Sequence, residues 1–174
     1  MIVIMAGLPG TGKSALASKL AKDLKGTVIS KDIVRHTLFE KRDVEYSAEQ
    51  DDFCMGIMLQ TAAYLLRKTP QRFIFLDGRT FSRRYQLQRV IEFAGDLQQP
   101  WKVLECKCSD TTAERRLFQH KGQNLHAAMN RTFDLYLQVK DRFEEITTPK
   151  TVIDTDLPLN KSVNEALRAI TSSS

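Results

Sequence analysis

The sequence lacks any long hydrophobic run. Its longest apolar segments, such as Ile2–Ala6 and Phe73–Leu76, are far shorter than the roughly 20 residues that a membrane-spanning helix requires. The first residues also lack the positively charged leader and small-residue cleavage site of a secretory signal. We therefore expect a cytoplasmic protein that does not insert into a membrane.

Cysteine and histidine are scarce. The three cysteines, Cys54, Cys106 and Cys108, show no CxxC spacing, and the three histidines are not spaced as metal ligands. Disulfides and a zinc site are therefore not expected. Repeats, low-complexity segments and long linkers are absent as well, so residues 1–174 are expected to form a single domain.

Positive charge is in modest excess, with a net charge of +5 and a pI near 9.2. Such a balance suits anionic ligands such as nucleotides. The sequence contains neither a basic run nor an interleaved aromatic stripe that would follow a nucleic-acid strand. Nucleic acid is therefore a less favoured partner than a small molecule.

Short apolar runs alternate with longer amphipathic stretches, a pattern typical of an α/β protein whose parallel sheet is covered by helices. The candidate strands are Ile2–Ala6, Thr27–Ser30, Phe73–Asp77, Trp101–Lys107 and Thr151–Asp154. The candidate helices are Lys13–Lys25, a long helix from Ser47 to Thr69, Ser82–Leu97, Thr111–His120, Leu125–Phe143 and Asn160–Ile170.

One segment between the first strand and the first helix matches the phosphate-binding pattern GxxxxGK[ST] at every fixed position. It comprises Gly7, Leu8, Pro9, Gly10, Thr11, Gly12, Lys13 and Ser14. Its glycines allow backbone N–H groups to turn toward phosphate oxygens, and the helix directs its positive end at the same anion. We expect Lys13 to reach the outer phosphates and Ser14 to offer its hydroxyl to Mg²⁺.

Two carboxylates are expected at the edge of the sheet where the P-loop lies. Asp77 ends an apolar strand and is a candidate Walker B residue that orders Mg²⁺. Asp32 follows the second strand and is a candidate general base, kept ionised by Lys31 or Arg35. The alternative is that Asp32 only caps the helix that follows.

The P-loop, Ser30-Lys31-Asp32-Ile33-Val34-Arg35 and Asp77-Gly78-Arg79-Thr80 together resemble the P-loop kinases related to polynucleotide kinase, chloramphenicol phosphotransferase and zeta toxin. The resemblance extends over nearly the whole chain. It implies a three-layer P-loop NTPase fold like that of nucleoside-monophosphate kinases, with a five-stranded parallel sheet flanked by helices and a small helical lid at about 111–131. It also implies that Asp32 is the general base and that Arg35 contacts substrate.

The chain departs from that family after its Walker B carboxylate. Family members often have Asp-Ala-Thr or Asp-Thr-Asn, where this chain has Arg79 two residues after the aspartate. Together with Arg83 and Arg84, Arg79 suggests that the acceptor is acidic or phosphorylated. We therefore assign Arg79 and Arg83, along with Arg35, as candidate substrate-binding residues.

In the same family, lid arginines clamp the phosphates during transfer. By resemblance Arg116 is the best candidate, and Lys121 or Arg131 would supply a further cation for the nucleotide phosphates. For each of these three residues, a solvated helix face is the alternative.

These patterns predict an enzyme that transfers the γ-phosphate of Mg-ATP to a hydroxyl of a small-molecule acceptor. ATP is expected over GTP from the resemblance and because no Asn-Lys-x-Asp guanine motif is present. Two alternatives stay open: a 5′-hydroxyl polynucleotide kinase, and a nucleotide-binding regulatory module with little catalysis. The sequence does not indicate the acceptor or the oligomeric state.

Overall fold

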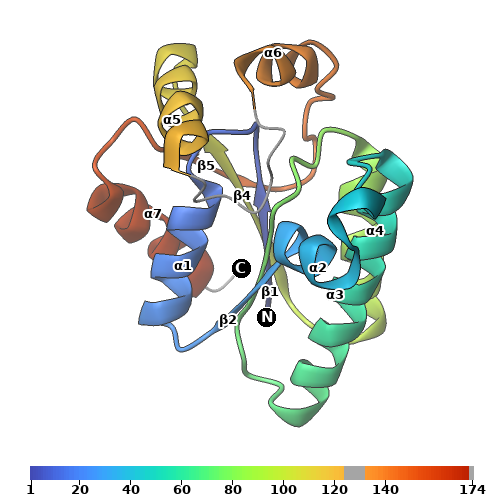
Figure 1. The fold of residues 1–174 in the computed structure, drawn as a ribbon. Coiled ribbons are helices and arrows are strands. Elements are labelled where there is room, and N and C mark those ends of the chain that lie inside the picture. Colours follow the sequence, from blue (N-terminus) through green and yellow to red (C-terminus); the bar gives the residue numbers. More distant parts are fainter. Residues whose placement is uncertain (124–131, 173–174) are drawn as a thin grey trace.

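A five-stranded parallel sheet forms the centre of the protein (Figure 1). The computed structural model describes residues 1–123 and 132–172, with side chains for all of these except residues 120–123. The strands follow the order β2-β3-β1-β4-β5. Their bounds are β1 Ile2–Ala6, β2 Thr27–Ser30, β3 Ile74–Asp77, β4 Trp101–Lys107 and β5 Thr151–Asp154.

Helices cover both faces of this sheet. They are α1 Lys13–Asp23, α2 Lys31–Leu38, the short 3₁₀ helix η1 Lys41–Asp43, α3 Ala48–Lys68, α4 Arg84–Asp96, α5 Asp110–Gln123, α6 Phe133–Asp141 and α7 Leu159–Thr171. In Figure 1, α1 and α7 lie on one face, α3 and α4 lie on the other, and α5 and α6 lie beyond the carboxyl ends of the strands. The result is the three-layer P-loop kinase fold predicted from the sequence.

The central strands are apolar on both faces, so helices can cover both sides of the sheet and bury these strands completely. All five residues of β1 are inaccessible to solvent. Ile2 and Ile4 point into a cluster with α3 and α4, whereas Val3 and Met5 point into a cluster with α1 and α7. Burying a side chain of this size contributes about 1.5–3 kcal/mol, so β1 fixes the position of the P-loop that follows it. Among the described residues, no helix combines the length and the apolar character that a membrane crossing needs.

Local side-chain chemistry sets where two helices begin. The Ser47 hydroxyl accepts the Gln50 N–H at 3.1 Å, so Ser47 caps α3. The prediction of one helix over Leu125–Phe143 is wrong, because Thr132 has an extended backbone and its hydroxyl accepts the N–H of Leu135. This cap makes Phe133 the first residue of α6. Residues 124–131 lie outside the described part of the chain.

Strand register brings the candidate functional segments to one edge of the sheet. Ile2 of β1 pairs with Ile74 of β3, and Ser30 at the end of β2 pairs with Asp77 at the end of β3. The carboxyl ends of these three strands therefore deliver the P-loop, the start of α2 and Asp77 to the same edge. Ligands of open α/β sheets bind at this edge.

Candidate active site

The P-loop is held against the neighbouring strand. Gly7 has a φ of +126°, a conformation that side chains rarely tolerate. A Cβ at Gly7 would lie only 2.3 Å from the carbonyl oxygen of Cys106 in β4. The Gly7 N–H donates to the carbonyl oxygen of Thr80 at 3.1 Å. Only glycine fits this position, and it joins the P-loop to the segment that follows β3.

Lys13 lies over the loop that precedes it. Its ammonium donates hydrogen bonds to the carbonyl oxygens of Gly7 at 2.8 Å and Leu8 at 2.7 Å. The Leu8 carbonyl also accepts the Thr11 hydroxyl at 2.7 Å. A positive charge is thus fixed where the motif predicts the outer phosphates of a nucleotide.

One predicted magnesium ligand belongs to the P-loop, and the other ends the strand that pairs with β1. Ser14 is in the first turn of α1 and Asp77 is the last residue of β3. Asp77 is only 3% exposed, and its Oδ1 has no hydrogen-bond partner. A buried carboxylate oxygen without a donor suits a hydrated divalent cation. No group of three or more His, Cys, Asp or Glu side chains in the described residues could hold a metal alone, so Mg²⁺ would also need phosphate oxygens and water.

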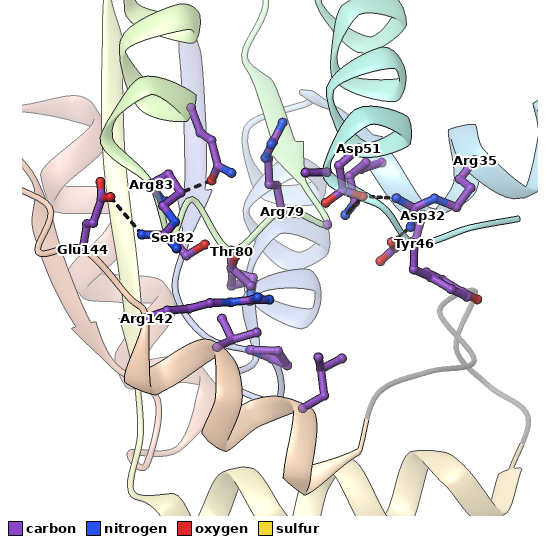
Figure 2. A pocket seen from close by; sticks show the side chains of 18 of the residues that line it. Asp32, Arg35, Tyr46, Asp51, Arg79, Thr80, Ser82, Arg83, Arg142 and Glu144 are labelled. Carbon is purple, nitrogen blue, oxygen red and sulfur yellow. Dashed lines mark hydrogen bonds and ion pairs between the residues drawn. The ribbon is translucent and has the colours of Figure 1, made fainter.

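A pocket of about 590 Å³ opens beside the P-loop (Figure 2). Its walls come from the P-loop, α2, the start of α3, residues 78–86, α6 and the segment after α6. The charged side chains that line it are Lys13, Lys31, Asp32, Arg35, Asp51, Arg79, Arg83, Arg142 and Glu144. The predicted phosphate ligand Lys13 and the predicted base Asp32 therefore line the same pocket.

Asp32 lies in the first turn of α2 and is 5% exposed. Its carboxylate is 3.6 Å from the guanidinium of Arg35, one turn later in the same helix. Ser30 occupies the N-cap position of α2 without a side-chain capping bond, and Asp32 lies two residues later in the first turn. Asp32 also lines the pocket.

Asp51 is the charge partner that sequence reasoning missed. It lies in the first turn of α3, and its carboxylate accepts a hydrogen bond from Lys31 at 2.7 Å and another from Arg35. The Arg35 side chain is 1% exposed, and its guanidinium lies over the Tyr46 ring at 5.0 Å. These contacts hold Arg35 at the pocket wall beside Asp32.

The other two predicted acceptor residues have acidic partners of their own. Arg79 is buried and donates to Asp52 at 2.7 Å, and the same carboxylate accepts the Tyr85 hydroxyl at 3.2 Å. Arg83 is more exposed and donates to Glu144 at 3.0 Å. Arg79 lies near the start of the segment that follows β3, and Arg83 lies near its end.

Glu144 joins this segment to the chain that follows α6. Its carboxylate accepts the backbone N–H of Arg84 at 2.8 Å as well as the guanidinium of Arg83. These two hydrogen bonds, the Arg84 N–H above all, hold the pKa of Glu144 below its usual value. Glu144 therefore stays ionised at neutral pH and offsets the charge of Arg83.

Of the three predicted lid residues, only Arg116 has a described side chain, and it does not line this pocket. Arg116 of α5 donates to the carbonyl oxygen of Thr155 at 2.6 Å and to that of Gly10 at 3.4 Å. Lys121 is in the last turn of α5, where side chains are not described, and Arg131 lies outside the described residues. Their roles stay predictions.

A family model with the description "AAA domain" matches residues 2–146, most of the chain. The chain belongs to this family. No curated protein matches the sequence. The match contains the P-loop, Asp32, Asp77 and every charged residue of the pocket, so the pocket is part of the family domain.

Solved structures with the same fold include two kinases and the nucleotide-bound protein Kti12. A gluconokinase from Sinorhizobium meliloti is 15% identical, with a TM-score of 0.68 over 97% of this chain and 90% of that one. The APS kinase CysC of Mycobacterium tuberculosis, bound to AMPPNP and APS, is 15% identical, with a TM-score of 0.70 over 98% and 97% of the two chains. Kti12 of Chaetomium thermophilum, bound to ADP-AlF₃, is 14% identical, with a TM-score of 0.67 over 99% and 100%. At these identities the likeness supports the P-loop kinase fold.

The AAA-domain fold brings together most of the residues singled out from the sequence. Lys13, Asp32, Arg35, Arg79 and Arg83 all line one pocket. Lys31, named as a neighbour that keeps Asp32 ionised, also lines it, and the charged or aromatic lining residues that sequence reasoning missed are Tyr46, Asp51, Tyr85, Arg142 and Glu144. The signal in the sequence that could have indicated Asp51 is its place among the acidic residues in the first turn of α3.

Proposed function

We propose that this protein is an ATP-dependent phosphotransferase that moves the γ-phosphate of Mg-ATP to a hydroxyl of a small-molecule acceptor. The observation that carries the proposal is that Lys13 and Asp32 line one pocket of about 590 Å³. A group that stabilises phosphate and a group that accepts a proton are the two elements that transfer to a hydroxyl requires.

The donor half of the reaction uses the P-loop. Backbone N–H groups of Gly7–Ser14 and the Lys13 ammonium would bind the phosphates, and Ser14 and Asp77 would hold Mg²⁺. When bound, Mg²⁺ neutralises charge on the β- and γ-phosphate oxygens. The buried, unpartnered Oδ1 of Asp77 supports this assignment.

In the acceptor half, Asp32 takes the proton from the acceptor hydroxyl. The hydroxyl oxygen forms a bond to the γ-phosphorus while the bond from that phosphorus to the bridging oxygen of ADP breaks. The proton stays on the Asp32 carboxylate, and ADP leaves with the bridging oxygen. Arg35, held beside Asp32 by Asp51, would orient the acceptor.

Two features favour a small acceptor over a nucleic-acid strand. The sugar-acid and APS kinases with the same fold act on small molecules by their names, and the pocket walls enclose a volume in the range of small-molecule sites. The narrower kinship with polynucleotide kinase, chloramphenicol phosphotransferase and zeta toxin is part of this proposal, as is a cytoplasmic location.

The test is transfer of label from γ-labelled ATP, with Mg²⁺, to a panel of sugars, nucleosides, hydroxy acids, aminoglycosides, chloramphenicol and 5′-hydroxyl oligonucleotides. Label on a small molecule is expected. Asp32→Asn should lower kcat by roughly 10²- to 10⁴-fold while ATP binding persists, because only the proton acceptor is lost. Asp96→Asn, at an exposed position at the end of α4, makes the same change away from the pocket and should leave transfer intact.

The other outcomes point elsewhere. Label on the oligonucleotide would favour a polynucleotide kinase. Tight ATP binding without transfer to any compound would favour a regulatory module. Full transfer by Asp32→Asn would remove Asp32 as the base.

A further inference from the structure

Most cations that line the pocket are already paired with a carboxylate of the protein. Asp51 accepts from both Lys31 and Arg35, and Arg79 is bound to Asp52 at 2.7 Å. These pairs lie around the start of α3, near the predicted base. An anion placed there would meet the negative charges of Asp32 and Asp51 as well as the cations, so this end of the pocket suits a neutral hydroxyl.

Arg142 differs from the other lining cations. It follows the last residue of α6, and its side chain makes no hydrogen bond or ion pair with any described residue. Figure 2 shows this side chain extending from the end of α6 into the pocket beneath Thr80. A guanidinium that points into a pocket without a protein partner presents its fork of N–H donors to a ligand.

Further donors lie at the same end of the pocket. Arg83 uses Nη1 to bind Glu144 and keeps other N–H groups, and its side chain is 42% exposed. The hydroxyl-bearing residues Thr80 and Ser82 also line this wall. The carboxylate of Glu144 is already bound to Arg83 and to the Arg84 N–H. It therefore does not pair with the guanidinium of Arg142.

We propose that the acceptor is an anionic hydroxy compound whose carboxylate, phosphate or sulfate group binds between Arg142 and Arg83 while its hydroxyl faces Asp32. This inference rests on the proposed function for the role of the hydroxyl. The anion site itself needs no phosphate transfer. It accounts for the guanidinium of Arg142 and the remaining N–H groups of Arg83, charged donors that a neutral sugar would not require.

The experiment measures binding by calorimetry while Mg-AMPPNP fills the P-loop, so that turnover is not needed. The probes are matched pairs: gluconate and glucitol, glycerate and glycerol, ribose 5-phosphate and ribose, adenosine 5′-phosphosulfate and adenosine. At least one anionic probe should bind at least 10-fold more tightly than its neutral partner. Arg142→Gln should weaken that binding roughly 10- to 100-fold, the range for losing a charged hydrogen bond, and added salt should weaken it too.

Arg115→Gln is the matched control, because Arg115 is exposed on α5 and lies outside the pocket. It should leave the affinity unchanged. The inference is overturned if neutral probes bind as tightly as anionic ones, if no anionic probe binds, or if Arg142→Gln binds the anion as well as the wild type. It is also overturned if Arg142→Gln weakens AMPPNP binding without acceptor, which would move Arg142 to the nucleotide site.

Failure of this inference and failure of the proposed function are distinguishable. Anion binding that depends on Arg142, with no transfer of label to any bound probe, would keep the anion site and remove the kinase proposal. Transfer of label to a neutral compound alone would keep the kinase proposal and remove the anion site.

Discussion

The guanidinium of Arg116 donates a hydrogen bond of 2.6 Å to the backbone carbonyl of Thr155, directly after β5. The Thr155 hydroxyl in turn donates to the carbonyl oxygen of Thr11 in the P-loop at 2.9 Å. Arg116 also reaches the Gly10 carbonyl at 3.4 Å. These bonds connect α5, the end of β5 and the P-loop, so Arg116 helps to hold the P-loop in place.

Replacing Arg116 with Ala should therefore weaken ATP binding and lower the free energy of unfolding by about 1–3 kcal/mol, because charged hydrogen bonds to backbone oxygens are lost. ATP titration by calorimetry and urea unfolding measure the two effects. Arg115→Ala, on the exposed side of the same helix, should change neither. Unchanged ATP affinity with a large fall in kcat would instead support a direct role of Arg116 in transfer.

Asp51→Asn should destabilise the protein by roughly 3 kcal/mol, because it leaves the buried Arg35 and Lys31 without their shared carboxylate. Chemical denaturation measures this loss. Glu49→Gln removes an acid from the same helix turn at an exposed position and is the control. Equal stability of the two variants would mean that the Asp51 ion pairs contribute little.

Gly7→Ala should fold poorly or lose at least about 3 kcal/mol of stability, because a Cβ there meets the Cys106 carbonyl oxygen and the backbone φ is positive. Gly95→Ala offers the opposite case. A Cβ at Gly95, inside α4, meets nothing within 4 Å, so this variant should gain up to about 1 kcal/mol. Thermal unfolding compares the two, and a stable Gly7→Ala protein would contradict the close approach.

The ion pair between Glu144 and Arg83 should stabilise the folded state at neutral pH and lose this effect in acid. Its folded-state pKa lies below the ordinary value of 4.5 because of the Arg84 N–H and Arg83. A carboxylate with a lowered pKa stabilises the folded state above its unfolded pKa and loses that effect as pH falls through its folded pKa. The difference in Tm between wild type and Glu144→Gln should therefore be constant near pH 7 and shrink below about pH 4.5.

The same substitution at the exposed neighbour Glu145 controls for general effects of charge. A Tm difference between wild type and Glu144→Gln that does not change from pH 7 to pH 3 would be inconsistent with the hydrogen bonds to Arg83 and Arg84.

The sheet was predictable because its strands are short apolar runs with polar boundaries. Four of the predicted strands have the observed bounds, and β3 begins at Ile74, one residue later than expected. The P-loop and the ends of β2 and β3 also followed from local patterns. The single helix predicted over 125–143 was wrong, since helical periodicity does not reveal the cap that Thr132 provides.

The charge partners of the pocket were not predictable in the same way. Asp51 is 20 residues from Lys31 and 16 from Arg35, and they meet because the start of α3 packs against α2. Arg142 lies beyond the range expected for the lid, and nothing local distinguishes it from the other charges of that segment. Such pairings depend on the packing of helices, which a single sequence does not encode in its periodicity.

The hydrogen bond from the Gly7 N–H to the Thr80 carbonyl oxygen joins the backbone of the P-loop to the backbone of the segment that follows β3. Gly7 is the first residue of the P-loop, and Thr80 lies between Arg79 and Arg83 on the wall of the pocket. We expect that a shift of the P-loop on binding phosphate would also move that wall, because this hydrogen bond joins the two backbone segments. Nucleotide and acceptor should thus enhance each other's affinity by the same factor, and phosphate should be spared from transfer to water until the acceptor is in place.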